Sequence, residues 1–199
     1  MSTAPHYSPI SVDDYLAGEQ NATRRHEYVE GVVYAMVGAT NTHNRIATNA
    51  TIAIGSQLRG KRCQVFNSDT KIRVQTARGT RFYYPDLSVV CRVNPATDTF
   101  QDEPAIVVEV ISESTRRTDE NEKREAYLSI DALAAYILVE QSSAAAVVYR
   151  RQKNEFSREA YAGFDAVISL PEIDCKLALA DLYEKVEFTP IPSDDEEFG

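Results

Sequence analysis

The chain has 199 residues, of which 43% are hydrophobic and 26% are charged, and its formal net charge at pH 7 is −9. This size and composition are typical of one soluble globular domain that needs no disulfides to support its core, and no apolar stretch approaches the length of a membrane span. The acidic balance argues against tight nonspecific binding to nucleic acid, whose affinity comes largely from phosphate contacts, but it does not exclude a local basic surface.

The ends of the chain differ in composition from the rest. The first ten residues carry two prolines and one histidine, without the basic start and apolar core of a signal peptide. We expect one domain over residues 8–188 and a disordered acidic tail over residues 189–199, which contain Asp194-Asp195-Glu196-Glu197. Because Cys63, Cys91 and Cys175 are odd in number and widely spaced, we expect reduced, buried thiols in a cytoplasmic protein.

Three helices are predicted in chain order. A short helix begins after the capping residue Ser11 and stops at Gly18. A long helix spans residues 41–58, where apolar side chains recur at helical spacing and Gly60 follows as a C-terminal cap. A further helix is predicted over roughly residues 118–130.

Strands are predicted between and after these helices. Two strands turn around Glu30-Gly31 within residues 28–37. The other predicted strands occupy residues 64–67, 71–75, 82–91, 105–111, 135–140, 145–150 and, near the end, 156–161. This order predicts an α/β fold with a central mixed β-sheet flanked by helices, partly antiparallel because of its hairpins.

Glu109 is the most informative residue, because it lies in the middle of an otherwise apolar run from Ala105 to Ile111. Burying a carboxylate is costly unless it is paired, hydrogen-bonded or bound to a metal. Asp86 follows Pro85 near the start of another strand, where proline is tolerated. Two neighbouring strands that each offer one carboxylate make a site for a hard divalent cation such as Mg²⁺.

Lys123 is a candidate third member of this site. On the predicted helix it shares a face with Asp119, Ala126, Tyr127 and Ile130. An inward-facing ammonium could orient an attacking water or neutralise a phosphate. The alternative is an Asp119–Lys123 pair on the surface, which is worth little energetically. Spacing alone does not decide between the two.

These residues together resemble the Uma-two family, a group of predicted endonucleases in the restriction-endonuclease-like, PD-(D/E)xK superfamily. The resemblance covers about Ser11 to about Leu182. It rests on Tyr84-Pro85-Asp86, Val107-Val108-Glu109-Val110-Ile111-Ser112, Ser114-Thr115-Arg116, Lys123, Tyr127, Glu27-Tyr28-Val29-Glu30-Gly31, Ala35-Met36, His43, Tyr136, Leu138 and Val139.

The resemblance implies a restriction endonuclease-like fold and metal-dependent cleavage of phosphodiester bonds. Asp86 and Glu109 would ligate Mg²⁺ or Mn²⁺, and the Val110 carbonyl would be a further ligand. The superfamily pattern expects lysine two residues after the acid, where this chain has Ile111, so the resemblance suggests that Lys123 takes that role.

Two further residues are supporting candidates in this family. Glu27 is an N-terminal acid of the kind that borders the metal site. His43 lies at the start of the long helix, where it could contact phosphate or bind the Glu27 carboxylate. The alternative is that His43 is a structural histidine whose ring is hydrogen-bonded in the core or at the helix cap, which is the more common situation for a lone histidine.

The main hypothesis is therefore a cytoplasmic, Mg²⁺-dependent endonuclease that acts on DNA in preference to RNA. The alternative is a catalytically weak or inactive module that keeps the fold and serves binding or assembly, which the negative charge and the displaced lysine favour. A metal-dependent hydrolase of another phosphate ester stays open. Two-fold homodimers are common among soluble proteins, but the sequence does not decide whether this chain forms one.

Overall fold

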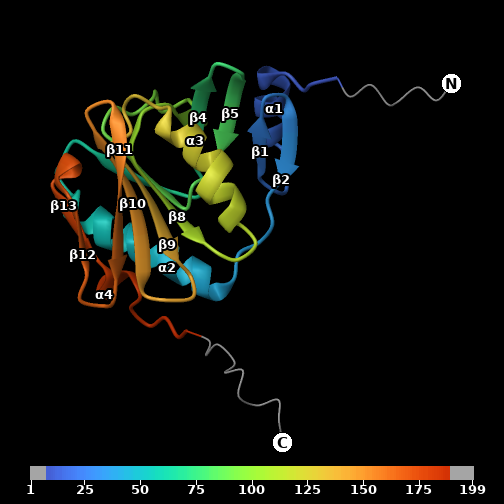
Figure 1. Cartoon of the computed structure of the whole chain (residues 1–199). Helices are drawn as coiled ribbons and strands as arrows, with labels where there is room; N and C mark the ends of the chain where they lie inside the picture. Colours follow the sequence, from blue (N-terminus) through green and yellow to red (C-terminus); the bar gives the residue numbers. More distant parts are fainter. Residues whose placement is uncertain (1–7, 189–199) are drawn as a thin grey trace, which may run out of the picture.

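The computed structural model describes residues 8–188, and the predicted acidic tail at 189–199 lies outside this range. Two large β-sheets organise this part of the chain (Figure 1). No helix within it combines the length and hydropathy required to cross a bilayer.

The helices are α1 (Val12–Glu19), α2 (Asn41–Gln57), α3 (Arg124–Leu128) and α4 (Leu179–Leu182), with a π-helical segment η1 (Thr118–Lys123) and a 3₁₀ turn η2 (Pro171–Ile173). The strands are β1 (His26–Val29), β2 (Val32–Ala35), β3 (Gln64–Asn67), β4 (Lys71–Thr76), β5 (Gly79–Tyr83), β6 (Leu87–Val90), β7 (Phe100–Gln101), β8 (Pro104–Ile111), β9 (Ala135–Glu140), β10 (Ala145–Gln152), β11 (Glu155–Ala162), β12 (Val167–Leu170) and β13 (Cys175–Ala178).

A six-stranded sheet in the order β11-β10-β9-β8-β6-β3 forms the centre of the molecule. Its β8–β9 pair is parallel and its other pairs are antiparallel, as expected for a mixed sheet. Along β8, side chains alternate between the two faces. Val108 and Val110 pack in the core that contains α2, whereas Val107 and Ile111 pack with α3. Glu109 lies two residues from Val107 and from Ile111, so its side chain points to the same face of the sheet as theirs, toward α3.

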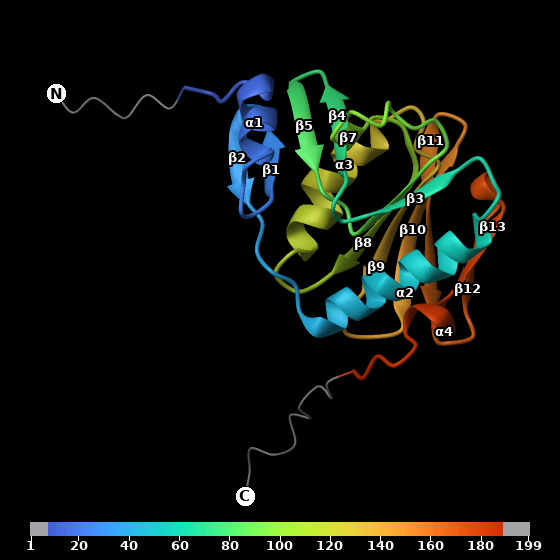
Figure 2. The ribbon, with the colours of Figure 1, turned by 180° about the vertical axis from the view of Figure 1, so that it is seen from behind.

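A five-stranded sheet in the order β2-β1-β5-β4-β7 covers the other side of α3 (Figure 2). Ile72 and Val74 of β4 belong to the same buried cluster as Tyr127 of α3. On the outer part of this sheet, Tyr15 of α1 packs against Tyr28 and Phe82, with ring centroids 5.0 and 5.3 Å apart respectively. The segment η1–α3 is therefore held between two sheets.

The prediction of one continuous strand over residues 82–91 is wrong, because the residues Tyr84-Pro85-Asp86 separate two strands. β5 ends before this segment in the five-stranded sheet, and β6 begins after it in the six-stranded sheet. Proline has a fixed φ and no amide hydrogen, so it cannot sit inside a central strand. Asp86 is thereby placed where the two sheets meet.

Several elements were not predicted from the sequence. The helix expected over 118–130 starts as the π-helical η1, and α3 ends at Leu128. The two-residue β7, the β12–β13 hairpin and α4 have too few residues to show a clear period. The hairpin and α4 pack through Ile168 and Leu179, among others, into the core beside α2.

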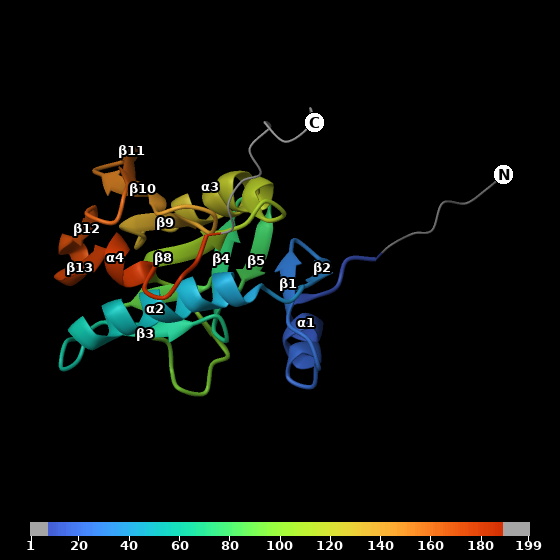
Figure 3. The ribbon, with the colours of Figure 1, turned by 90° about the horizontal axis from the view of Figure 1, so that it is seen from below.

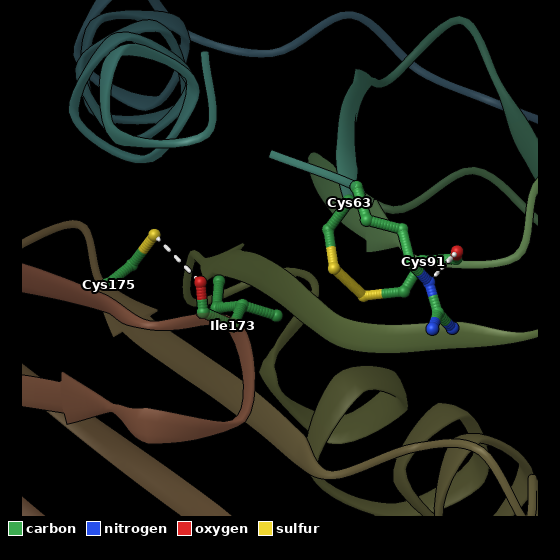
Figure 4. Close-up of a disulfide and its surroundings, with 5 residues drawn as sticks. Cys63, Cys91, Ile173 and Cys175 are labelled. Atoms are coloured by element: carbon green, nitrogen blue, oxygen red, sulfur yellow. Dashed lines mark hydrogen bonds between the residues drawn. A yellow bond between two sulfur atoms is a disulfide. The ribbon is translucent and has the colours of Figure 1, made fainter. Parts of the chain in front are cut away.

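The expectation of three reduced thiols is wrong for Cys63 and Cys91, which form a disulfide (Figure 4). β3 and β6 are antiparallel, with Gln64 opposite Val90, so the two cysteines occupy the next facing positions. This pairing depends on the sheet register, which spacing along the chain does not reveal. Cys175 is a buried free thiol, as predicted, and donates to the Ile173 carbonyl at 3.4 Å.

Candidate active site

The structure brings all five predicted side chains to one place between the two sheets. Glu109 projects from β8, and Asp86 precedes β6, whose Leu87 pairs with Val108. Lys123 ends η1 and Glu27 comes from β1. His43 is in the first turn of α2, whose N-cap Thr40 accepts a hydrogen bond from the His43 amide. Five segments that are distant in sequence therefore contribute to one cluster.

Lys123 lies at the centre of this cluster, among three carboxylates. Its Nζ is 2.9 Å from Glu27 Oε1, 3.5 Å from Glu109 Oε1 and 3.6 Å from Asp119 Oδ1. Lys123 is only 8% exposed and Asp119 only 3%. The alternative of a surface Asp119–Lys123 pair is therefore wrong, because the pair exists but is buried. Asp119 joins the site without having been predicted there.

Asp86 is held by donors from two other segments. Its Oδ1 lies 2.8 Å from His43 Nε2, and its Oδ2 accepts a hydrogen bond of 2.8 Å from the Val110 amide. The Asp86 amide in turn donates to Glu109 Oε2 at 3.4 Å. The expected His43–Glu27 contact is not formed, because Glu27 pairs with Lys123. For Val110, the contact with Asp86 is through its amide, and a role for its carbonyl stays a prediction.

The π-helical turn explains how both Asp119 and Lys123 come to be buried. η1 has a wider turn than an α-helix, and such turns are often found at functional sites. The Tyr136 hydroxyl donates to the Asp119 carbonyl at 3.0 Å and ties this turn to β9. The Lys123 ammonium also lies 5.7 Å from the centre of the Tyr83 ring. The turn is thus held from both sheets.

The charges in the cluster perturb one another strongly. Burial raises the pKa of Glu109 well above its usual value, with Asp119, Asp86 and Glu27 adding to the effect and Lys123 opposing it. Burial also raises the pKa of Asp119, again against the influence of Lys123. Burial alone would lower the pKa of Lys123, but the charges of Glu109, Glu27 and Asp119 outweigh it and raise that pKa well above its usual value.

The cluster carries more carboxylates than cations. Glu27, Glu109 and Asp119 surround one ammonium and Asp86 lies beside them against His43, so full ionisation of the four would leave buried negative charge that the ammonium does not balance. Carboxylate oxygens are the ligands that Mg²⁺ and Mn²⁺ prefer. Within residues 8–188, however, no three His, Cys, Asp or Glu side chains already converge as ligands of one ion. The donor set fits a hard cation, while its atoms are engaged with protein donors.

Ile111 occupies the position where the superfamily pattern expects lysine. Its side chain is 2% exposed and packs with Tyr127 and Tyr136 in the core beside α3. Lys123 reaches Glu109 from the next element along the chain instead. The Tyr127 hydroxyl also approaches Glu109 Oε1, at 3.5 Å. The location of Lys123 is therefore consistent with the displacement that the sequence suggested.

Fold and site together define a restriction-endonuclease-like α/β protein. A crystal structure of an Anabaena variabilis protein, described as a "putative nuclease belonging to DUF820", has this fold with a TM-score of 0.70 and 20% sequence identity, and the match covers 88% of this chain and 98% of that one. The chain belongs to the Uma2 family, whose model, described as "Putative restriction endonuclease", matches residues 12–180. This is the Uma-two family that the motifs resemble.

Two relatives from Synechocystis sp. are similar over most of their length. The uncharacterized protein slr1290 is 31% identical over 151 residues, which are 75% of this chain and 78% of slr1290. The uncharacterized protein sll1609 is 29% identical over 135 residues, which are 66% of this chain and 75% of sll1609. Neither name specifies a family or an activity.

Proposed function

We propose that this protein is a metal-dependent endonuclease that hydrolyses phosphodiester bonds. The observation that carries this proposal is a cluster of four carboxylates, of which Glu27, Glu109 and Asp119 surround the buried Lys123 ammonium and Asp86 adjoins Glu109. Such a group is costly for folding, since it buries charge that the described residues do not balance. Sites of this kind are typical of function, where perturbed pKa values cluster. Membership of the Uma2 family supports the nuclease class.

The ion would be held by Asp86, Glu109 and the Val110 carbonyl. When bound, Mg²⁺ or Mn²⁺ supplies Lewis-acid chemistry, polarising a phosphate and activating a water molecule. In the structure, Asp86 is orientated by His43 and by the Val110 amide. His43 is therefore proposed as a positioning residue for Asp86, because its ring nitrogen contacts that carboxylate directly.

Lys123 is proposed to act on the substrate through its ammonium. An ammonium in a water-poor site stabilises the negative charge that develops on a phosphate during hydrolysis. Glu27 holds Lys123 at 2.9 Å and is in turn approached by the Tyr84 amide at 3.4 Å. Glu27 is therefore proposed to position Lys123.

The substrate is proposed to be DNA in preference to RNA, on the strength of the family's description as restriction endonucleases. We further propose that the protein works in the cytoplasm. Disulfides are uncommon in a reducing compartment. A Cys63–Cys91 pair that is oxidised in cells would therefore count against a cytoplasmic location.

The test is cleavage of single- and double-stranded DNA and RNA with Mg²⁺ or Mn²⁺, compared with EDTA. We expect divalent-dependent cleavage, reduced at least about 100-fold in Asp86→Asn and Glu109→Gln. Glu113→Gln is a matched control, because Glu113 is exposed and outside the cluster. Melting curves would show that each variant is folded. Equal cleavage by all variants would contradict the proposed site.

The second candidate function is a nucleic-acid-binding or assembly module with weak or no cleavage. Two observations favour it: Ile111 replaces the expected lysine, and Lys123 is already surrounded by three carboxylates. Binding of nucleic acid by the purified protein, without cleavage under any of the metal conditions above, would establish this alternative and exclude the first.

A further inference from the structure

A cavity of about 790 Å³ lies beside the candidate active site. It is bounded by residues from the end of α1, from β3, from the start of β4 and from the segment 93–101. In Figure 3, α1 and the segment after β6 project from the same side of the molecule. The volume is within the usual range of about 300–1,000 Å³ for pockets that take small ligands.

Lys71 lines this cavity as a buried cation. It is 5% exposed, and within residues 8–188 its ammonium has neither a hydrogen bond nor an ion pair. Its contact in the cavity is the Tyr84 ring, whose centre lies 5.3 Å from Nζ. Burial lowers the pKa of Lys71, with Glu19 acting in the opposite direction. Because the Lys71 ammonium lines the cavity without an anionic partner among these residues, a ligand that supplies an anion would be favoured there.

Two of the three carboxylates that line the cavity are engaged by basic groups, and the third, Asp98, accepts among the described residues only from the Asn94 side-chain amide, at 3.3 Å. Glu19 accepts from the Tyr84 hydroxyl at 2.8 Å and lies 2.7 Å from the His26 ring nitrogen. Asp69 is paired with Arg25. Arg24, by contrast, is exposed at the cavity and forms no ion pair within the described part of the chain. The cavity therefore offers two cations without an ion pair in the described part of the chain, Lys71 and Arg24, and one carboxylate in the same situation, the exposed Asp98.

Aromatic and amide side chains also contribute to the lining. Phe66, Tyr84 and Phe100 contribute rings, and Gln64 and Asn94 contribute amide groups. Aromatic rings are platforms on which nucleobases stack, and side-chain amides can hydrogen-bond base edges. Together with the cations, this lining matches a ligand that has both a phosphate and a flat heterocycle.

The cavity adjoins the acidic cluster through Tyr84. Its ring lines the cavity, while its amide donates to Glu27 Oε1 at 3.4 Å. Glu27 contacts Lys123, and Asp86 follows Tyr84 two residues along the chain. A ligand in the cavity and a phosphate at the cluster would therefore lie on either side of one residue.

We propose that this cavity binds a nucleotide, with its phosphate on Lys71 and Arg24 and its base against the aromatic rings. Resting on the proposed nuclease function, we assign this nucleotide to the substrate strand, next to the bond that is cleaved. The cavity would then determine which nucleotide is accepted beside the cleavage point. A free mononucleotide has the same chemistry, and the experiments below distinguish the two sources.

The first experiment measures binding of the four 2′-deoxynucleoside 5′-monophosphates and of inorganic phosphate by calorimetry, without divalent metal. We expect at least one nucleotide to bind more tightly than phosphate, and Lys71→Met to weaken it about tenfold or more, since a charge-assisted hydrogen bond is lost. Lys176→Met, which alters an exposed lysine of β13, is the matched control. Glu109→Gln should retain binding, which separates the cavity from the metal site.

Folding of each variant is checked by its melting curve. Lys71 is buried, so Arg24→Gln, at an exposed position, keeps the test decisive if Lys71→Met does not fold. We expect Arg24→Gln to weaken nucleotide binding about threefold to tenfold. Absence of nucleotide binding, or equal binding by wild type and both cavity variants, would overturn the proposal. Equal affinity for phosphate and nucleotides would overturn the role of the aromatic rings.

The second experiment measures oligonucleotide cleavage by the same variants. If the nucleotide belongs to the substrate strand, Lys71→Met should raise KM about tenfold with a smaller change in kcat, and the preference for the flanking base should weaken. Nucleotide binding that depends on Lys71, in a protein that cleaves nothing, would support a free-nucleotide site and contradict the nuclease function. Cleavage that is identical in wild type and Lys71→Met would overturn the assignment to the substrate strand.

Discussion

At the scale of single residues, Glu109 lowers the stability of the fold but supplies a carboxylate for the proposed catalytic site. Its carboxylate is almost fully buried and shares Lys123 with two other acids. One ammonium cannot balance all of them, and the raised pKa values of Glu109 and Asp119 express that imbalance. Active-site groups of this kind are commonly kept despite their cost to folding.

This imbalance predicts how stability depends on pH in the metal-free protein. Glu109 and Asp119 have raised pKa values in the folded state, so the folded chain binds more protons than the unfolded chain above their ordinary pKa values. Stability should therefore fall as pH rises from about 4 through the raised values. Lys123 contributes no slope there, because its raised pKa stabilises the fold at every pH below its unfolded value of about 10.4.

The test is to compare melting curves of wild type and Glu109→Gln between pH 5 and 8, in EDTA. The variant should lose part of the slope and be more stable by about 1 kcal/mol at the upper end, with Glu113→Gln as the exposed control. Parallel curves for wild type and Glu109→Gln would show that Glu109 does not titrate in this way.

The sequence predicted most of the site's members but fewer of its contacts. Glu109 stood out because a carboxylate in an apolar strand is unusual, and Lys123 because it shares a helix face with Tyr127. The His43–Asp86 contact depends on how α2 crosses the end of β6, which no local pattern encodes. Asp119 was placed on the same helix face as Lys123, but the only role considered for it was in a surface pair, which the spacing could not exclude.

At the scale of elements, η1 sets where the Lys123 ammonium lies. The wide turn precedes α3, whose Ala126 and Tyr127 are anchored between the sheets. The extra residue of a π-helical turn decides the direction in which the side chains before α3 point. The exposed Asn121 lies within η1, and its side chain donates to the Arg117 carbonyl at 2.7 Å.

Deletion of Asn121 should convert the turn toward α-helical geometry and leave Asp119 three residues before Lys123 instead of four, which shifts the carboxylate relative to the ammonium on the same helix face. We expect cleavage to fall up to about 100-fold, because a small misplacement of an active-site group is costly, and stability to fall by about 1–3 kcal/mol, because a buried charge-assisted contact is disturbed. Asn121→Ala is the control, since it keeps the residue count and should retain cleavage. Full activity in the deletion variant would show that η1 does not position the lysine.

Elements with a clear period were predicted well, and those defined by long-range contacts were not. The helix at residues 41–58 and the strand at residues 105–111 differ from α2 and β8 by only a residue at one end. One strand was predicted over residues 82–91 because the residues on both sides of Pro85 favour strands, whereas the expected position of Asp86 near a strand start is confirmed by β6. The partners of Cys63 and of the short β7 are set by the register of strands distant in sequence, so local propensity carries no signal for them.

At the scale of the whole molecule, metal binding should stabilise the fold. An ion that binds only the native state adds RT ln(1 + [L]/Kd), which is about 2.7 kcal/mol at a concentration 100 times Kd. For a domain of this size, we expect the melting temperature to rise by about 5–10 °C with Mg²⁺ or Mn²⁺. Differential scanning fluorimetry over a metal titration measures this change.

The same titration on Asp86→Asn and Glu109→Gln provides the control. Both variants should lose most of the metal-dependent rise, whereas Glu113→Gln should keep it. A rise that is equal in all four proteins would place the stabilising ion elsewhere. No rise in wild type at millimolar metal would remove the basis for the catalytic function and favour the nucleic-acid-binding alternative.

The chain passes from the five-stranded sheet to the six-stranded sheet at Tyr84-Pro85-Asp86, and this has a consequence for the dynamics of the molecule. Glu27 belongs to the five-stranded sheet, whereas Glu109 belongs to the six-stranded sheet and Lys123 lies between them. Any sub-global opening in which the sheets separate would break the Glu27–Lys123 pair while each sheet kept its own backbone hydrogen bonds. The complete cluster is thus a property of the docked sheets, and a partly opened chain would retain much of its secondary structure without an intact site.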